Sequence, residues 1–236
     1  KPLTFSNTII DSILDKISQQ SNFKLTEKEV AQGIVAAPDK YFIVNDLSKF
    51  NEEERSFIKP FYTSTARYFN QKTNYYLIYL SHKNFQGKNI NDFPNIKNHF
   101  AKYKTQLQRA KIKYGTPQKP YFYVHREREE HFFKKGPKIA GQTRTFFPCF
   151  LYTEDEYYGS RAMNFIKTDR INLKYLVALL NSTLIFFWLK HKGKRLGEML
   201  HIDKEPLLAL PLKIVPENSQ RPFIRIVDEI LSIHEQ

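Results

Sequence analysis

The sequence is poor in the residues that cross-link a chain or hold a metal. Its single cysteine, Cys149, excludes an internal disulfide and any metal site built from several cysteines. His99, His125 and His131 do not follow a zinc-ligand spacing, so no metal site is predicted. One free cysteine fits a reducing compartment, and we expect a cytoplasmic protein.

Long apolar runs are also missing. The most apolar stretch, residues 173–189, is interrupted by Lys174 and by the polar residues 181–183. A membrane-spanning helix needs about 20 mostly apolar residues, so this stretch predicts a buried helix and no membrane contact. No leader peptide is recognisable and the chain begins without Met, which indicates a fragment of a longer protein or a processed product.

Positive charge, by contrast, is abundant and unevenly distributed. Residues 95–144 carry thirteen Lys and Arg against three Glu, a net +10 of the chain's +13. The flanking segments are nearly neutral, which argues against a merely lysine-rich, solvated composition. Aromatic residues lie among the basic ones: Tyr103, Tyr114, Tyr121, Phe122, Tyr123, Phe132 and Phe133. This combination is typical of a surface that binds a polyanion, and DNA is the leading prediction.

The hydrophobic pattern predicts an α+β protein, with short mixed strands followed by helices. Hydrophobic residues make up 41% of the 236 residues, enough for a core in one large or two small domains. Helices are predicted at residues 6–20, 52–58, 91–111 (capped by Asn91 or Asp92), 173–189 and 222–234. Strands are predicted at residues 33–37, 41–44, 75–80, 121–124, 138–141, 149–152 and 162–166, the first two joined as a hairpin.

A series of short motifs resembles one protein family in order and spacing. It comprises residues 33–44, Ile-Lys-Pro-Phe at 58–61, Tyr-Tyr-Leu-Ile-Tyr at 75–79, Phe-Pro-Asn-Ile at 93–96, Tyr-Lys at 103–104, Leu-Leu-Asn-Ser at 179–182, residues 193–201, Leu-Pro-Leu at 210–212 and Arg-Pro-Phe-Ile at 221–224. Over nearly the whole chain it resembles the TaqI-like C-terminal specificity (target recognition) domain of type IIG restriction-modification enzymes and adenine-N6 DNA methyltransferases. Type I specificity subunits carry related domains.

The resemblance implies one compact specificity domain, with a double β-helix-like body followed by a C-terminal α-hairpin. We expect the target recognition body and N-terminal helix at residues 1–168, and a helical scaffold at residues 169–236. The implied partners are double-stranded DNA and a methyltransferase domain of the same polypeptide. S-adenosylmethionine is expected on that domain, with no cofactor in this chain. Ala36, Ala37 and Asp39 depart from the family's usual Thr-Gly and Asn, which puts a DNA contact by this turn in question.

No catalytic motif accompanies these features. An adenine methyltransferase needs an Asn/Asp-Pro-Pro-aromatic loop for the flipped base, and the sequence contains neither a Pro-Pro pair nor a Gly-rich loop for S-adenosylmethionine. Glu27-Lys28-Glu29 matches a metal-nuclease motif only weakly. The chain is therefore predicted to be non-catalytic by itself. Its parent protein is expected to be an adenine-specific DNA methyltransferase, with or without a fused endonuclease.

The basic segment offers two kinds of DNA contact. Lysines on the predicted helix, such as Lys97 and Lys111, suit phosphate oxygens, which fix register. Arginines in predicted loops suit guanine O6 and N7, and Gln142 suits adenine. The predicted contact set is Lys40, Lys97, Lys102, Lys104, Lys119, Tyr121, Arg126, Arg128, Lys134, Lys135, Lys138, Gln142 and Arg144.

Alternatives remain for parts of this set and for the function. Arg126 and Arg128 could instead form ion pairs with Glu127, Glu129 and Glu130, and Tyr121 could be a core residue rather than one that stacks on a base or sugar. The other functional readings are a protein-interaction scaffold with a basic face, the specificity domain of a type I or phage-defence methyltransferase system, and a degenerate nuclease.

Overall fold

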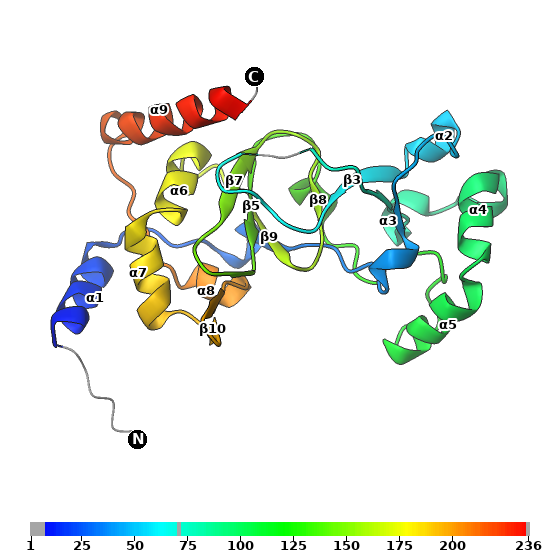
Figure 1. Ribbon diagram of the computed structural model, residues 1–236, viewed down its shortest axis with the longest axis horizontal. Helices are drawn as coiled ribbons and strands as arrows, with labels where there is room; N and C mark the ends of the chain where they lie inside the picture. Colours follow the sequence, from blue (N-terminus) through cyan, green and yellow to red (C-terminus); the bar gives the residue numbers. More distant parts are fainter. Residues whose placement is uncertain (1–7, 70–71, 235–236) are drawn as a thin grey trace.

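The computed structural model describes residues 8–69 and 72–234, and a four-stranded antiparallel sheet forms its centre (Figure 1). Its strand order is β1 (Val30–Gln32), β9 (Met163–Ile166), β5 (Lys138–Gln142) and β7 (Phe150–Thr153). Both faces of this sheet are buried. Ile139 and Ile166, paired in register, belong to one core, whereas the next pair, Ala140 and Phe165, belongs to the other. Successive side chains of each strand therefore join two different cores.

The first core lies between the central sheet and a second sheet. That sheet has the order β2 (Ile43–Val44), β4 (Tyr76–Ile78), β3 (Ile58–Tyr62) and β8 (Tyr158–Gly159), with β8 parallel to β3. Four helices extend this end of the molecule: α2 (Glu52–Arg55), α3 (His82–Phe85), α4 (Pro94–Ala101) and α5 (Lys104–Lys113). Phe42, Phe85 and Phe100 are almost completely buried there.

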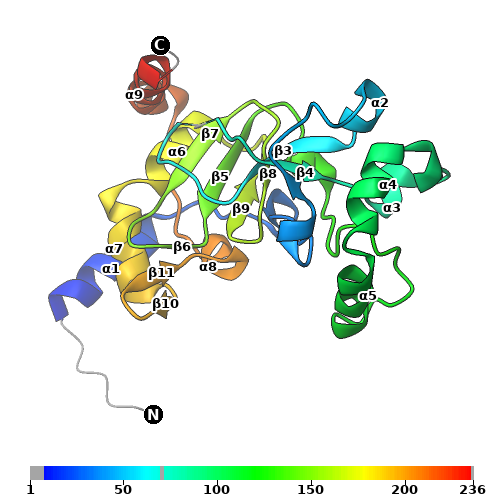
Figure 2. The same cartoon turned by 45° about the vertical axis from the view of Figure 1, so that its right-hand side comes forward.

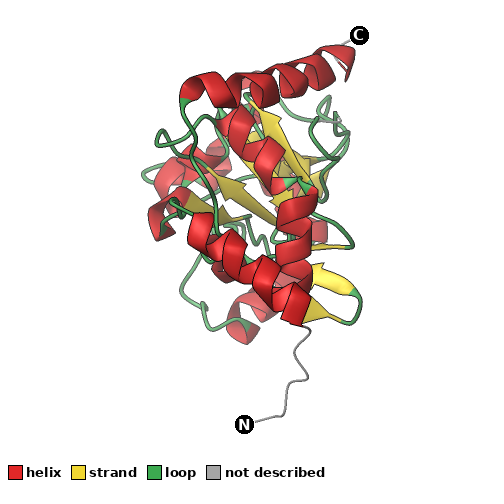
Figure 3. Cartoon of the chain, turned by 90° about the vertical axis from the view of Figure 1, so that its left-hand side faces the viewer, coloured by secondary structure: helices red, strands yellow, loops and turns green. Residues whose placement is uncertain are grey.

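The second core lies between the central sheet and a layer of helices, which Figure 3 shows from their own end. The layer contains α6 (Leu173–Leu180), α7 (Thr183–Lys192), α8 (Lys204–Leu208) and α9 (Glu217–His234), with α1 (Thr8–Gln20) beside α7. A small third sheet, β10 (Arg195–Leu196), β11 (Met199–His201) and β6 (Arg144–Thr145), lies at the same end (Figure 2).

The α+β class and most helices are confirmed, but several predicted elements are wrong. The hairpin of residues 33–37 and 41–44 does not form: β2 pairs with β4, whereas Ile34 and Val35 bridge to Ser160 and Arg126. No strand forms at 121–124, where the backbone turns. The first helix begins at Thr8, and its predicted start at Ser6 lies outside the described residues.

Both long predicted helices are broken. The helix of residues 91–111 divides into α4 and α5 at Lys102 and Tyr103, and neither Asn91 nor Asp92 caps it, because Phe93 occupies the N-cap of α4. The helix of residues 173–189 divides into α6 and α7, which meet at a bend of 56°. In the described part of the chain no single helix is long and apolar enough to cross a membrane, and only this bent pair passes that test when its two halves are combined.

Asn181, which separates α6 from α7, attaches the helical layer to the edge of the central sheet. Its side chain is 1% exposed, accepts a hydrogen bond from Phe150 N (3.0 Å) and donates one to Phe150 O (2.8 Å). The side-chain amide of Asn181 thus makes the two hydrogen bonds to β7 that the backbone of a neighbouring strand would make. Buried backbone groups need such partners, and an unpaired one costs about 1–3 kcal/mol.

We expect Asn181→Ala to lower the free energy of unfolding by about 1–3 kcal/mol, because Phe150 N loses its hydrogen-bond acceptor, whereas Phe150 O keeps the hydrogen bond from Tyr68 N (2.8 Å). Urea denaturation measures this change. The control is Asn98→Ala on the exposed face of α4, for which a change within about 0.5 kcal/mol is expected. Equal effects in the two variants would contradict the role assigned to Asn181.

Candidate nucleic-acid interface

A buried carboxylate positions the basic helix α4, which α5 follows directly in the chain. Glu54 is fully buried and accepts hydrogen bonds from the first free N–H groups of α4, those of Asn95 (2.7 Å) and Ile96 (3.2 Å). It also accepts a bond from Asn51 N (3.0 Å), so that one carboxylate connects α2 to α4. These bonds hold the pKa of Glu54 below its usual range despite the opposing effect of burial. The negative charge also suits the positive end of the α4 dipole.

The outer surface of these two helices carries only positive charge. Lys97, Lys102, Lys104, Arg109 and Lys113 are exposed, and no Asp or Glu occurs between residues 94 and 113. None of the ion pairs found in the described residues involves these five side chains. Lys104 Nζ lies 5.8 Å from the ring centroid of Tyr121, which is half-buried against the first core. We call this set the α4–α5 basic face.

Lys111, predicted on the same face, points inward instead. Its side chain is 2% exposed, and its Nζ donates a hydrogen bond to the carbonyl of Tyr123 (2.5 Å). Burial, together with the nearby charge of Lys119, lowers its pKa to about 8. Lys111 therefore anchors the loop after α5 and is corrected from a phosphate contact to a structural residue.

Two further predicted contacts in this segment are held by the protein itself. Lys119 Nζ donates to His125 O (3.1 Å). Arg128 donates to Gln32 Oε1 (3.0 Å) and Gly33 O (3.3 Å), so it forms neither a free base contact nor the alternative ion pairs with neighbouring Glu residues. Its backbone lies at φ 62°, in the left-handed region, where these bonds hold it.

The remaining basic side chains between α5 and β5 are all exposed, but they differ in whether they form ion pairs. Arg126 is exposed, while its backbone bridges to Val35. Lys134 is exposed and lies 3.2 Å from Glu130, an ion pair one helical turn apart. Lys135 is exposed.

Lys138 is buried at the start of β5 and is corrected as well. It is 0% exposed, its Nζ donates to Asp155 O (2.5 Å), and burial lowers its pKa to about 8. Its ammonium group is therefore used within the protein and is not presented to a phosphate. Among the predicted residues at the ends of β5, Gln142 is half-buried.

Arg144, by contrast, is exposed on the third sheet, and it has neighbours that the sequence did not reveal. It pairs with His201 across β6 and β11, and His201 N donates in turn to Lys194 O (2.9 Å). The hairpin of β10 and β11 that provides them turns at Gly197, with φ 62°. A Gly-X pair between two short extended runs is a known hairpin signal and would have located it.

The turn at residues 38–40 has the unusual backbone that the family pattern implies. Ala37 has φ 59°, a left-handed conformation that favours glycine, so Ala stands where the family's Gly would be unstrained. Asp39 Oδ1 accepts a hydrogen bond from Ala36 N (3.1 Å) and supports the turn. Lys40 is exposed and lies 4.9 Å from the ring centroid of Tyr41.

The free cations do not form one continuous strip. Figure 2 places α5 at one end of the molecule and β6 with β11 toward the other. A hollow of about 800 Å³ includes neither of these surfaces, and its lining contains Lys28, Arg128 and Lys204 but also Glu27 and Glu127. Lys204 pairs with Glu27 (2.5 Å), which neutralises part of that surface.

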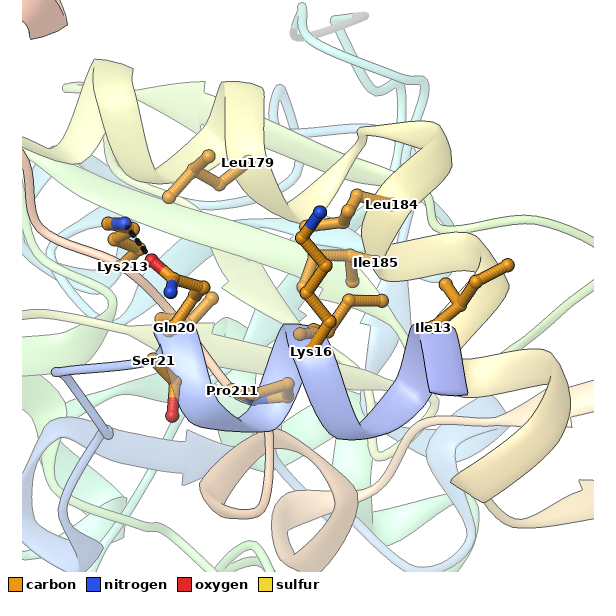
Figure 4. Close-up of a pocket in the computed structure, with 11 residues that line it drawn as sticks. Ile13, Lys16, Gln20, Ser21, Leu179, Leu184, Ile185, Pro211 and Lys213 are labelled. Carbon is orange, nitrogen blue, oxygen red and sulfur yellow. Dashed lines mark hydrogen bonds between the residues drawn. The ribbon is translucent and has the colours of Figure 1, made fainter. Parts of the chain in front are cut away.

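A second hollow, of about 420 Å³, is lined mainly by aliphatic side chains of α1 and α7, with Lys16 and Lys213 at its rim (Figure 4). Its apolar lining is unsuited to a polyanion. Within the described residues, no group of three His, Cys, Asp or Glu side chains comes close enough to hold a metal ion.

The buried Lys111 predicts a pH dependence. A lysine whose pKa falls to about 8 on folding is less easily charged in the folded state than in the unfolded state, so stability rises with pH from about 8 to about 10.5. Lys111→Met removes this contribution. The free energy of unfolding of the wild type, relative to the variant, should therefore increase between about pH 7 and about pH 10 in urea titrations.

Lys113→Met is the matched control, since it removes an exposed charge from the same helix. The free energy of unfolding of the wild type relative to Lys113→Met should not increase over this pH range. If the Lys111→Met and wild-type curves ran parallel over the whole range, the side chain would not be buried as described.

Comparisons with known proteins agree with this architecture. The family model of the TaqI-like C-terminal specificity domain matches residues 67–212. The type II methyltransferase M.HincII of Haemophilus influenzae is 26% identical over 194 residues, which are 74% of this chain and 36% of that protein. M.HindII, from Haemophilus influenzae strain ATCC 51907 / DSM 11121 / KW20 / Rd, is 26% identical over 204 residues, 78% and 37% respectively. The chain thus spans just over a third of these relatives.

Two solved structures share the fold. The type IIL restriction-modification enzyme MmeI, determined in complex with DNA, superposes with a TM-score of 0.64 and 15% identity, covering 92% of this chain and 29% of MmeI. The type IIG restriction endonuclease BpuSI gives a TM-score of 0.54 and 10% identity, covering 94% and 28%. At these identities the likeness concerns the fold.

Proposed function

This chain belongs to the family of TaqI-like C-terminal specificity domains, and we propose that it recognises a short sequence in duplex DNA for a restriction-modification methyltransferase. In this proposal the chain has no catalytic activity of its own. Methyl transfer, S-adenosylmethionine binding and any DNA cleavage belong to other parts of a longer polypeptide, as the relatives named methyltransferases suggest.

The α4–α5 basic face is the observation that carries the proposal. Its cations have no carboxylate partners among the described residues, and they lie on α4, whose N-terminus is bound by Glu54, and on α5, which follows it. Unpaired lysines bind phosphate oxygens and release condensed counterions, which supplies most non-specific affinity. MmeI, which shares the fold, was determined in complex with DNA. We therefore expect phosphate contacts from Lys97, Lys102, Lys104 and, beside them, Lys40.

The proposal is tested by fluorescence polarisation with labelled duplexes at several salt concentrations, and by selection from a pool of duplexes with a randomised centre. Salt-dependent binding together with enrichment of one short sequence supports it. Equal affinity for heparin and for every duplex would instead support a scaffold with a basic face. Cleavage of plasmid in the presence of a divalent metal would support a nuclease.

Lys102→Ala is expected to weaken binding to all duplexes alike and to reduce the slope of log K against log salt by about 1. One phosphate contact is lost, and phosphate carries no sequence information. Titrations at several salt concentrations measure the slope. The control Lys16→Ala removes an exposed lysine from α1, away from the α4–α5 basic face, and should leave the slope unchanged.

Arg144→Ala is expected to reduce the preference for one base pair by about 1–3 kcal/mol, because Arg can pair with guanine O6 and N7. Duplex selection followed by titration with single-base variants measures it. The matched control is Arg161→Ala, an exposed arginine in the turn before β9. An Arg144→Ala protein that selects the wild-type sequence would contradict base recognition by this residue.

A further inference from the structure

The third sheet carries a solvent-exposed face whose residues come from two segments about fifty positions apart. In antiparallel strands, directly opposed residues point to the same side of the sheet. The register pairs Arg144 with His201 and Leu196 with Met199, and His201 follows Met199 by two positions. These four side chains therefore share one face, which we call the β10–β11 outer face.

This face is exposed to solvent, whereas the central residue of the opposite face is buried. Arg144 is exposed, Leu196 is 54% exposed, and the side chain of His201 is 32% exposed. On the other side, Leu200 is 2% exposed within the second core. At the hairpin tip, a Cβ added to Gly197 would meet no atom within 4 Å, so the turn projects into open space. The face thus places an exposed leucine and a half-buried methionine beside an exposed arginine.

The base of the hairpin is held rigidly. Ile202 N donates to Thr143 O (2.7 Å), and Thr143 N and Oγ1 both donate to Ala162 O (2.9 and 3.0 Å). Asn164, buried in β9, donates from Nδ2 to Ile202 O (2.5 Å). The central sheet thus fixes where Arg144 and His201 lie, which is what a recognition surface requires.

The charges around this face favour contact with bases over contact with phosphates. Lys194, opposite His201, is hydrogen-bonded to Glu205 and lies 3.8 Å from Asp203. Asp203 also lies 3.9 Å from His201 Nε2. Arg144 is therefore the cation of this face without a carboxylate partner in the described residues, and the paired charges of Lys194 and His201 give this face little attraction to a phosphate backbone.

We propose that the β10–β11 outer face enters the major groove of duplex DNA as a β-ribbon. Leu196 and Met199 contact base edges beside Arg144, and these contacts determine part of the recognised sequence. The inference rests on the proposed function and extends it to residues outside the basic segment. The hairpin of β10 and β11 has two strands about 4.8 Å apart, so with its side chains it fits a groove about 12 Å wide and not one about 6 Å wide, and Arg144 reaches the bases from β6, the strand beside the hairpin. Apolar side chains contact the thymine methyl group, which lies in the major groove.

A tethered-duplex experiment tests the placement. Leu196→Cys and Arg195→Cys are each made in a Cys149→Ser background. Arg195 is the matched control, because it is exposed on the same strand but shares the opposite face with Leu200. The probes are duplexes with an activated disulfide tether on cytosine N4, in the major groove, or on guanine N2, in the minor groove. Cross-linking rates are normalised to the reaction of each thiol with a small disulfide.

The Leu196→Cys protein should cross-link to the major-groove tether on the order of tenfold faster than to the minor-groove tether. It should also cross-link to the major-groove tether on the order of tenfold faster than the Arg195→Cys protein does. Equal rates, or preference for the minor groove, would overturn the proposal. So would a failure to cross-link while polarisation shows the duplex bound, as expected if this face docks on protein. If the wild type binds no duplex, the proposed function itself fails. If Cys149→Ser lowers the melting temperature, Leu196→Cys and Arg195→Cys are compared in the protein that keeps Cys149. The cross-linking of Cys149 alone, measured in the wild type, is then subtracted.

A second measurement is independent of the cysteine background. Met199→Ala should reduce the preference for one base pair by about fivefold or more without changing the salt slope. Arg195→Ala, on the opposite face, should leave the preference intact. An unchanged preference in Met199→Ala would remove that residue from the recognition surface.

Discussion

The structure depends on a central sheet that is buried on both faces. Because Ile139 and Ile166 join one core while Ala140 and Phe165 join the other, a slip of one residue would exchange the two sets. The register is therefore fixed from both sides. Everything at the two ends of the molecule, from the α4–α5 basic face to the third sheet, is positioned relative to this one element.

Buried polar groups attach the outer elements to that centre. Glu54 connects α2 to α4, and Asn181 connects α6 to β7. A third connection is Glu29 before β1, whose carboxylate accepts bonds from Arg170 Nε (2.7 Å) and Thr26 N (2.7 Å). Arg170 lowers the pKa of Glu29 to about 2, so the pairing persists well into acid. Each of these groups acts between segments that are distant in sequence.

The sequence predicted those features that depend on local pattern. The α+β class, the first helix, the central strands β5, β7 and β9 and the family resemblance all follow from periodicity or motif order, and they were confirmed, whereas β1 was not predicted. The hairpin at residues 33–44 failed because Ile34 and Val35 find partners far along the chain, at Ser160 and Arg126. Such pairing is decided by tertiary packing, which local propensity does not report. The division at residue 168 stays a prediction, although strands and helices share the second core.

Charge counting located a basic segment but could not separate binding cations from structural ones. Lys111 and Lys138 look like their exposed neighbours in the sequence, yet both are buried against carbonyl groups. Lys102, at the break between α4 and α5, stays exposed because the buried side chains of the two helices, such as Phe100 and Leu107, point the other way. Only the fold decides which side of a short helix each lysine occupies. The predicted DNA contacts remain predictions. The set now excludes the buried Lys138 and keeps the residues whose side chains are accessible to DNA.

Under the proposed function, the distance between the α4–α5 basic face and the β10–β11 outer face has a consequence for recognition. Phosphate contacts set affinity and base contacts set sequence preference, and here the two kinds of residue lie at different ends of one rigid frame. The β10–β11 hairpin is short, projects from the core and is joined to it through Thr143, Asn164 and Ile202. Leu196 and Glu198, beside Gly197 at its tip, are exposed and belong to neither core. A recognition domain arranged in this way can change the sequence it selects while keeping its stability and its general affinity for DNA.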